Sequence, residues 1–165
     1  PATDPTAEAT EAPAAETAEA EYKLGMGVSV SLDSSDTNKA QVDATVATVV
    51  TDSEGKIVLC RIDCAQNKMD VTGGQVDTAA TYTTKRDLKY DYNMVKYGNA
   101  IAEWDAQAKA FADYTVGMTA DEVSAMETTE HNGHDVTVDE TLFASCTMDI
   151  TGMRAPIATA AKNAR

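Results

Sequence analysis

Two stretches of this chain alternate hydrophobic and polar residues with the period of a β-strand. In residues 41–51, QVDATVATVVT, every second position from 42 to 50 is valine, alanine or threonine. In residues 56–64, KIVLCRIDC, the apolar positions 58, 60, 62 and 64 stand against Arg61 and Asp63. The turn-forming residues DSEG separate the two runs. The pattern therefore predicts an antiparallel hairpin in which each strand has one apolar face.

A third strand is predicted before this hairpin. Residues 22–32, YKLGMGVSVSL, are rich in strand-forming residues, and Gly25 and Gly27 indicate a bulge or a close approach of another backbone. The polar residues 33–39 between the strands contain calcium-ligand types but lack the EF-hand spacing, so we expect a solvated loop. After the hairpin, residues 65–84 predict shorter, more polar strand segments.

The hydrophobic period changes to that of a helix at residue 99. Residues 99–117 carry Ile101, Trp104, Ala108, Phe111 and Ala112 at helical spacing, which predicts an amphipathic helix that covers one face of the sheet.

The rest of the chain mixes helix and strand signals. Thr119 followed by Glu122 is a capping box that predicts a short second helix, with Val123 turned inward. HNGH at 131–134 predicts a turn, residues 141–150 are expected to end as a strand, and residues 152–164 predict a helix with Pro156 near its first turn. This order predicts one α+β domain over residues 22–165, an antiparallel sheet with helices packed on one side.

The charge of the chain narrows the classes of partner. The 165 residues contain 13 Lys and Arg against 27 Asp and Glu, a net charge of -14. Such a chain repels nucleic acid and anionic lipid headgroups, so neither is expected as a partner. Residues 1–21 hold six of the acidic residues, no basic residue and no large apolar one, which predicts a disordered acidic spacer.

No pattern in the sequence predicts an enzyme or a metal site. Cys60, Cys64 and Cys146 are too few for a disulfide scaffold and fall on apolar half-periods, where burial makes thiols inert; a disulfide between Cys146 and either Cys60 or Cys64 is the alternative. His131 and His134 lie on the predicted turn and favour an exposed loop over a zinc site. Aromatic residues instead suggest a pocket for a planar ligand: Tyr82, Tyr90, Tyr92 and Trp104.

Most of the chain after residue 21 resembles a group of uncharacterised secreted lipoproteins of anaerobic Gram-positive bacteria. The stretches that carry the resemblance are EYKLGMGV, AQVDATVATVVTDSEGKIVLCRIDCAQNKMDV, TTKRDLKYDYNM, AEWDAQAKAFADYTVGMTADEVSAM and LFASCTMDITGMRAPIATAAKNA. Those lipoproteins are similar in turn to the FMN-binding domain of extracytoplasmic electron-transfer proteins, on a strand-turn-strand followed by a threonine-containing segment. The resemblance implies an FMN-binding-domain-like fold.

In flavinylated members of the FMN-binding family, an Asp and a Ser/Thr-Gly-Ala-Thr motif present a threonine that carries FMN through a phosphoester bond. The best match here runs from Thr78 to Thr81, which implies Thr81 as the acceptor beside Thr78 and Asp77. Ala79 replaces the motif glycine, and Asp77 directly precedes Thr78 instead of standing two residues further upstream. We therefore expect Thr81 to be an unmodified strand residue, with FMN as the alternative.

The resemblance also implies where the protein works. We expect a non-enzymatic extracytoplasmic domain that binds a small ligand or a surface protein. Its acidic spacer is similar to the tether that follows the lipid-modified cysteine of lipoproteins, so the expected contact with a membrane is a lipid anchor on a cysteine upstream of this sequence. Two alternatives stay open: an electron-transfer module with FMN on Thr81, and a structural or adhesive surface protein.

Overall fold

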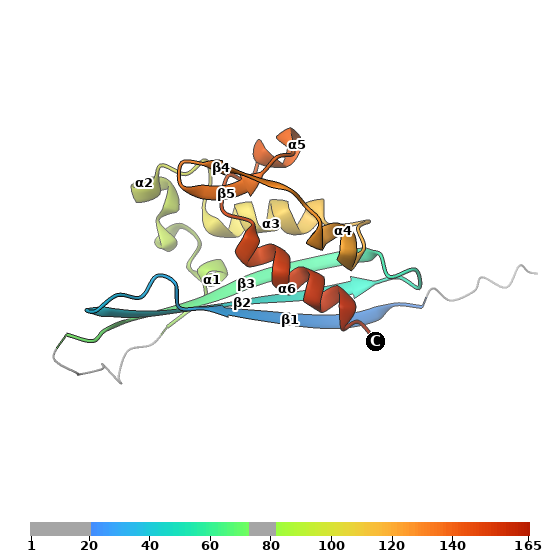
Figure 1. The fold of residues 1–165 in the computed structure, drawn as a ribbon, viewed down its shortest axis with the longest axis horizontal. Coiled ribbons are helices and arrows are strands. Elements are labelled where there is room, and N and C mark those ends of the chain that lie inside the picture. The colour runs from blue at the N-terminus through green and yellow to red at the C-terminus, as the bar shows by residue number, and fades with distance from the viewer. Residues whose placement is uncertain (1–20, 73–81) are drawn as a thin grey trace, which may run out of the picture.

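Three antiparallel strands form the base of the molecule (Figure 1). The computed structural model describes residues 21–72 and 82–165, and the strands are β1 (Lys23–Ser31), β2 (Lys39–Thr51) and β3 (Ile57–Asp70), in the order β1-β2-β3. The register places Gly27 opposite Ala47 and Ala47 opposite Ile62. The hairpin predicted from the alternating pattern is confirmed. Beyond it, β3 continues without a break to Asp70, and the part of the predicted strand segments at residues 73–81 lies outside the described residues.

All helices of the described chain lie on one side of this sheet (Figure 1). A small antiparallel hairpin lies at the far side of the helical layer. The elements are α1 (Lys85–Leu88), the 3-10 turn η1 (Lys89–Tyr92), α2 (Met94–Gly98), α3 (Trp104–Tyr114), α4 (Ala120–Ser124), β4 (Thr128–His131), β5 (His134–Thr137), α5 (Glu140–Phe143) and α6 (Thr151–Lys162). The predicted α+β class, an antiparallel sheet with helices on one side, is confirmed.

The glycines of β1 allow α6 to pack directly on the strand. A Cβ atom on Gly25 would overlap the carbonyl oxygen of Ala160, and one on Gly27 would overlap that of Pro156. Only a residue without a side chain fits against a backbone at this distance. The expected close approach of another backbone is thus confirmed, and its partner is the last helix of the chain.

Pro156 lies in the middle of α6, not in its first turn as the composition suggested. A proline inside a helix has no N–H for the carbonyl four residues earlier, which here is that of Gly152. The hydroxyl of Ser29 in β1 donates to this carbonyl oxygen at 3.4 Å. The sheet therefore supplies the hydrogen bond that the helix lacks.

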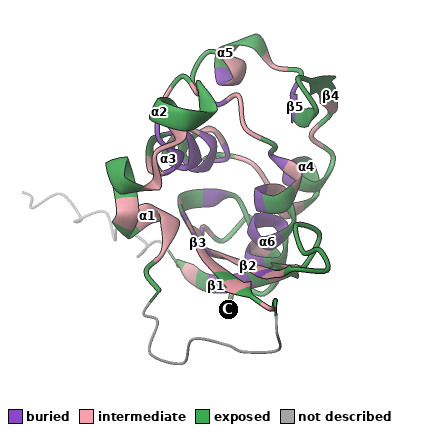
Figure 2. Cartoon of the chain, turned by 90° about the vertical axis from the view of Figure 1, so that its left-hand side faces the viewer, coloured by how far each residue is buried: buried purple, intermediate pink, exposed green. Residues whose placement is uncertain are grey.

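The predicted amphipathic helix is α3. Trp104, Ala108, Phe111 and Ala112 are buried in the core, as expected, whereas Ile101 precedes the helix and is 55% exposed. Figure 2 shows the buried residues gathered where α3 and α6 face the sheet.

Two local signals in the second half of the chain are confirmed. Both hydrogen bonds of the capping box between Thr119 and Glu122 are present, and Val123 is fully buried. The HNGH turn joins β4 to β5, with Asn132 and Gly133 both at positive φ.

The strand expected at the end of residues 141–150 is wrong. Asp139 caps the helical turn α5 by accepting from the Leu142 N–H, and the chain then continues without strand pairing. Cys146 and Ile150 enter the core individually, so their alternation reflects burial in an irregular segment. Residues 85–98, for which the sequence pattern predicted no element, form the helical turns α1, η1 and α2.

The two apolar half-periods of the hairpin lie on opposite faces of the sheet. Val46 pairs with Asp63, and Thr45 pairs with Cys64. Ile62 and Cys64 therefore face the helices, while the valine series of β2 faces away from them. Val58 leaves the predicted series, because the register shift after Val50 buries Ile57 in its place.

Candidate functional site

A cavity of about 770 Å³ lies between the covered face of the sheet and the helical layer. All three strands contribute to its floor. Its walls come from α1 to α3, the β4-β5 hairpin and the start of α6. Among the described residues, this is where polar, charged and aromatic side chains from distant parts of the sequence meet.

Lys85, the first residue of α1, places a largely buried ammonium in the wall. Its Nζ lies 3.5 Å from Oδ1 of Asp43 on β2, and the two side chains are 13% and 20% exposed. The same Nζ lies over two aromatic rings, 5.2 Å from the centroid of Tyr92 and 5.7 Å from that of Trp104. A partly desolvated cation over aromatic faces is stabilised by their negative potential, so this group is held in place from three sides.

Asp43 is fixed on the floor by two amides. It accepts from Nε2 of Gln41 at 2.7 Å and from Nε2 of Gln66 at 2.8 Å. Burial alone would raise the pKa of Asp43, but these hydrogen bonds and the Lys85 ammonium outweigh it and hold the pKa below its usual value. Burial alone would likewise lower the pKa of Lys85, and its neighbours Tyr92, Cys64 and Asp43 raise it overall. The pair is therefore ionised at neutral pH.

Two buried side chains position the walls. Glu103 accepts from the backbone N–H groups of Met94 at 2.9 Å and Val95 at 3.3 Å, which joins the start of α2 to the start of α3. Gln107 is fully buried, donates to the Ala102 carbonyl and accepts from the Thr147 N–H at 2.9 Å. Because buried polar groups are costly to leave unpaired, these contacts hold Trp104 and the facing loop at a defined separation.

The two histidines of the predicted turn, His131 and His134, lie at the rim of the same cavity. His131 contacts Phe143 edge to face at 5.2 Å, and its Nε2 lies 3.0 Å from Nδ2 of Asn132. His134 also lines the cavity. No group of three or more His, Cys, Asp and Glu side chains that suits a metal ion occurs in residues 21–72 and 82–165.

The three thiols are free and protonated. Burial raises the pKa of Cys60 to about 11 and also raises the pKa of Cys64 and Cys146. Cys64 lines the cavity but is only 2% exposed. A thiol of this kind is a poor nucleophile at neutral pH, so Cys64 contributes shape to the cavity.

The structure brings together only part of the predicted site. Tyr92 and Trp104 line the cavity, whereas Tyr90 is 82% exposed outside it and Tyr82 donates from its hydroxyl to the Lys68 carbonyl on the edge of β3. The predicted flavin-site residues lie outside the described part of the chain: Asp77, Thr78 and Thr81.

Sequence reasoning missed the polar floor and the ammonium. Gln41 and Asp43 occupy the half-period of β2 that faces the helices, opposite to its valine series. A signal was present in the polar residues that alternate with those valines, but the alternation does not say which half-period meets the helices. Lys85 was hidden inside a charged run, TTKRDL, that is also typical of an exposed turn.

Comparison with known proteins does not assign a function, so the function is inferred from the geometry of the cavity. No protein-family model, curated protein or solved structure matches the chain. Among the helices that the structure describes, none has the length and apolar character needed to cross a membrane.

Proposed function

We propose that this protein is a non-enzymatic binding domain that holds a small planar molecule between its sheet and its helical layer. The observation that carries the proposal is the cavity of about 770 Å³ with the Trp104 ring and the Lys85 ammonium in its wall. Its size lies within the range of roughly 300–1,000 Å³ that is usual for small-molecule sites, and an aromatic wall with a few fixed polar groups is their usual chemistry.

The charges of the lining favour a ligand with at most one negative charge. The lining contains one ammonium, that of Lys85, and two carboxylates, those of Asp43 and Asp149. The Lys85 ammonium has three N–H donors, and its polar neighbours among the described residues are Asp43 and Tyr92, so one donor is left to bind an acceptor group of the ligand. A planar ring with one carboxylate or carbonyl substituent satisfies this arrangement.

FMN, the cofactor that the family resemblance implies, matches the cavity only in part. The isoalloxazine ring suits the aromatic wall, but a phosphate dianion does not suit a lining with more carboxylates than ammonium groups. We therefore assign the described cavity to a ring without a phosphate. Flavinylation of Thr81 remains a separate hypothesis, and a protein mass measured after purification from the native host tests it.

We extend the proposal to an extracytoplasmic domain, supported by the resemblance to secreted lipoproteins and by the acidic composition of residues 1–21. A surface protein as the partner, or a structural and adhesive role, would need no cavity. Fractionation of the native host tests the location, since recovery in the cytosolic fraction would contradict it.

The experiment that tests ligand binding uses Trp104, because it is the only tryptophan in the chain. Its fluorescence is followed during titration with 4-hydroxybenzoate, with the neutral 4-hydroxybenzamide, with riboflavin and with FMN. We expect saturable changes with the ring compounds, weaker binding of FMN than of riboflavin, and preference for the benzoate over the benzamide. Free N-acetyltryptophanamide corrects for absorption by the probes.

Two variants make the outcome specific to the cavity. A Cβ on Gly152 would have no atom within 4 Å, and Gly152 lines the cavity, so Gly152→Phe should fill it and abolish binding. Lys85→Met should remove the preference for the benzoate. Tyr90→Ala, at a residue 82% exposed, is the matched control. Absence of any saturable change, or unchanged binding by Gly152→Phe, would contradict the proposal.

A further inference from the structure

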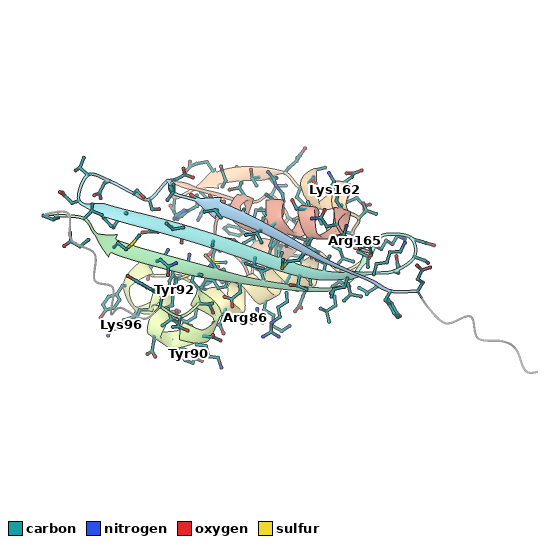
Figure 3. The ribbon with its side chains drawn as sticks, turned by 90° about the horizontal axis from the view of Figure 1, so that it is seen from below. Arg86, Tyr90, Tyr92, Lys96, Lys162 and Arg165 are labelled. Carbon is teal, nitrogen blue, oxygen red and sulfur yellow. The ribbon has the colours of Figure 1, made fainter. Side chains whose placement is uncertain are left out.

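The face of the sheet that points away from the helices is apolar along its first strand. We call this surface, formed by the outward residues of β1, β2 and β3, the open face; Figure 3 views the sheet from this side. The outward residues of β1 are between 50% and 64% exposed: Leu24, Met26, Val28 and Val30. The register places Val46 and Val50 of β2 beside them. An apolar surface of this extent indicates contact with another molecule.

Backbone carbonyls at both edges of the sheet already accept hydrogen bonds from other parts of the chain. At the β1 edge, the backbone N–H of Arg165 donates to the Leu24 carbonyl at 3.3 Å, and Asn163 donates to the Met26 carbonyl at 3.2 Å. At the β3 edge, Arg86 donates to the Ile62 carbonyl at 2.9 Å. Figure 3 shows Arg165 and Arg86 on these two flanks. Addition of a strand would displace these contacts, so the partner packs on the open face itself.

The charges of the open face are self-complementary. Among the outward positions of the three strands, only Arg61 and Asp63 are charged, and they are successive outward residues of β3. Arg61 forms no ion pair within the described residues. Asp63 accepts hydrogen bonds through Oδ1 from the N–H groups of Cys64 and Arg86, and Oδ2 makes none with a described residue.

We propose that a second copy of this chain packs its open face on this one, about a two-fold axis perpendicular to the strands. The axis lies between the two sheets, parallel to them, at the level of Gly27, Ala47 and Ile62, which are partners in the register, and so crosses over the middle of β1. It places Arg61 of each copy against Asp63 of the other. A two-fold contact must be complementary to itself, and this pattern meets that condition.

The apolar positions pair under the same axis. Leu24 faces Val30 of the second copy, Met26 faces Val28, and Val46 faces Thr48. Sheets that stack face to face cross at about 30°, so the pairs close to the axis make the closest contacts. Each outward apolar residue of β1 thereby gains an apolar partner, and the two charged residues gain opposite charges.

The size of the surface predicts a reversible dimer. The nine residues of β1 span roughly 30 Å, and three strands span about 14 Å, so each copy contributes on the order of 400 Å² of projected area along β1. Because β2 and β3 are longer than β1, each copy contributes about 600 Å² when all three strands are included. The two copies together would then bury about 1,200 Å², which is the lower end for specific interfaces. The net charge of -14 on each copy opposes association, so added salt should strengthen the dimer.

Sedimentation equilibrium over an approximately hundred-fold range of protein concentration tests this proposal. We expect a monomer-dimer equilibrium that shifts toward the dimer as ionic strength rises. Arg61→Asp places like charges together at two symmetric points and should weaken dimerisation by about 10-fold or more. Combining Arg61→Asp with Asp63→Arg should restore the affinity to within about 3-fold of the wild type.

Val28→Glu provides an independent test at the centre of the open face. A carboxylate there would be buried against Met26 of the second copy, so the variant should be monomeric. Val138→Glu is the matched control, because Val138 and Val28 are both 50% exposed and Val138 lies away from the sheet. Far-ultraviolet circular dichroism confirms that each variant is folded. A wild type that stays monomeric throughout, or a dimer that survives Val28→Glu, would overturn the proposal.

Discussion

The two faces of the sheet carry very different side chains, although both belong to the same alternating strands. On the covered face, β1 contributes Gly25 and Gly27, and the floor combines fully buried Ala47 and Ile62 with the polar Asp43. On the open face, β1 contributes four large apolar residues that are at least half exposed. Hydrophobicity therefore does not decide which half-period of β1 is buried. The close approach of α6 decides it, because only glycine fits beneath the helix.

The largest contrast between the two faces is expected at neighbouring residues of β1. Gly27→Ala forces a Cβ against the Pro156 carbonyl, which belongs to a rigid helix, so we expect a loss of about 4 kcal/mol in the free energy of unfolding. Val28→Ala, on the open face, should cost the monomer less than about 1 kcal/mol. Urea denaturation at low protein concentration measures both. Equal losses would show that α6 does not limit the side chain at residue 27.

A second contrast lies on β3. Ile62 is fully buried on the covered face and Leu59 is 53% exposed on the open face. Ile62→Ala leaves a cavity in the core and should cost about 3 kcal/mol, whereas Leu59→Ala should cost below about 1 kcal/mol. Unfolding midpoints in urea give the comparison. A larger effect at Leu59 would mean that the open face is the better packed one in the monomer.

The charged floor should make the covered face sensitive to acid. Asp43 has a pKa below 3.8 in the folded state, so its ionised form stabilises the fold above that value, and this contribution disappears as pH falls through the folded pKa. Asp43→Asn should cost about 1–2 kcal/mol at neutral pH, and its difference from the wild type should shrink as the pH falls below about 4.

Thermal unfolding measured across that pH range tests the effect. The pKa of Lys85 is raised, so its contribution is complete below 10.5, disappears only as pH rises through the folded pKa, and is constant in acid. Asp33→Asn, in the loop after β1, is the control for general charge effects. A pH-independent difference between the wild type and Asp43→Asn would contradict the assigned role of the Asp43 carboxylate.

The smallest expected effect is a gain in stability. Gly152 lies in the first turn of α6, and a Cβ there meets no atom within 4 Å. Gly152→Ala should therefore stabilise the fold by about 0.5–1 kcal/mol through the reduced entropy of the unfolded chain. Thermal denaturation compares the stability of Gly152→Ala, on α6, with that of Gly27→Ala, on the strand that α6 covers. Destabilisation by Gly152→Ala would show that the glycine is required by α6 itself.

Local signals in the sequence determined the elements whose stabilising contacts are local. The alternating runs predicted the hairpin, Thr119 with Glu122 predicted the start of α4, and Asn132 with Gly133 predicted the turn between β4 and β5. Each of these features depends on residues that are close in the chain. Of the four aromatic residues suggested for a ligand pocket, Tyr92 and Trp104 line the cavity.

Only the tertiary structure decided which face of each strand is covered and which polar groups meet. Pro156 is accommodated in mid-helix because Ser29, 127 residues earlier in the sequence, donates to the freed carbonyl of Gly152. Asp43 and Lys85 meet beside Trp104 because α1 and α3 pack on the same side of β3. Strand alternation is symmetric between the two faces of a sheet, and contacts between residues distant in sequence remove that symmetry.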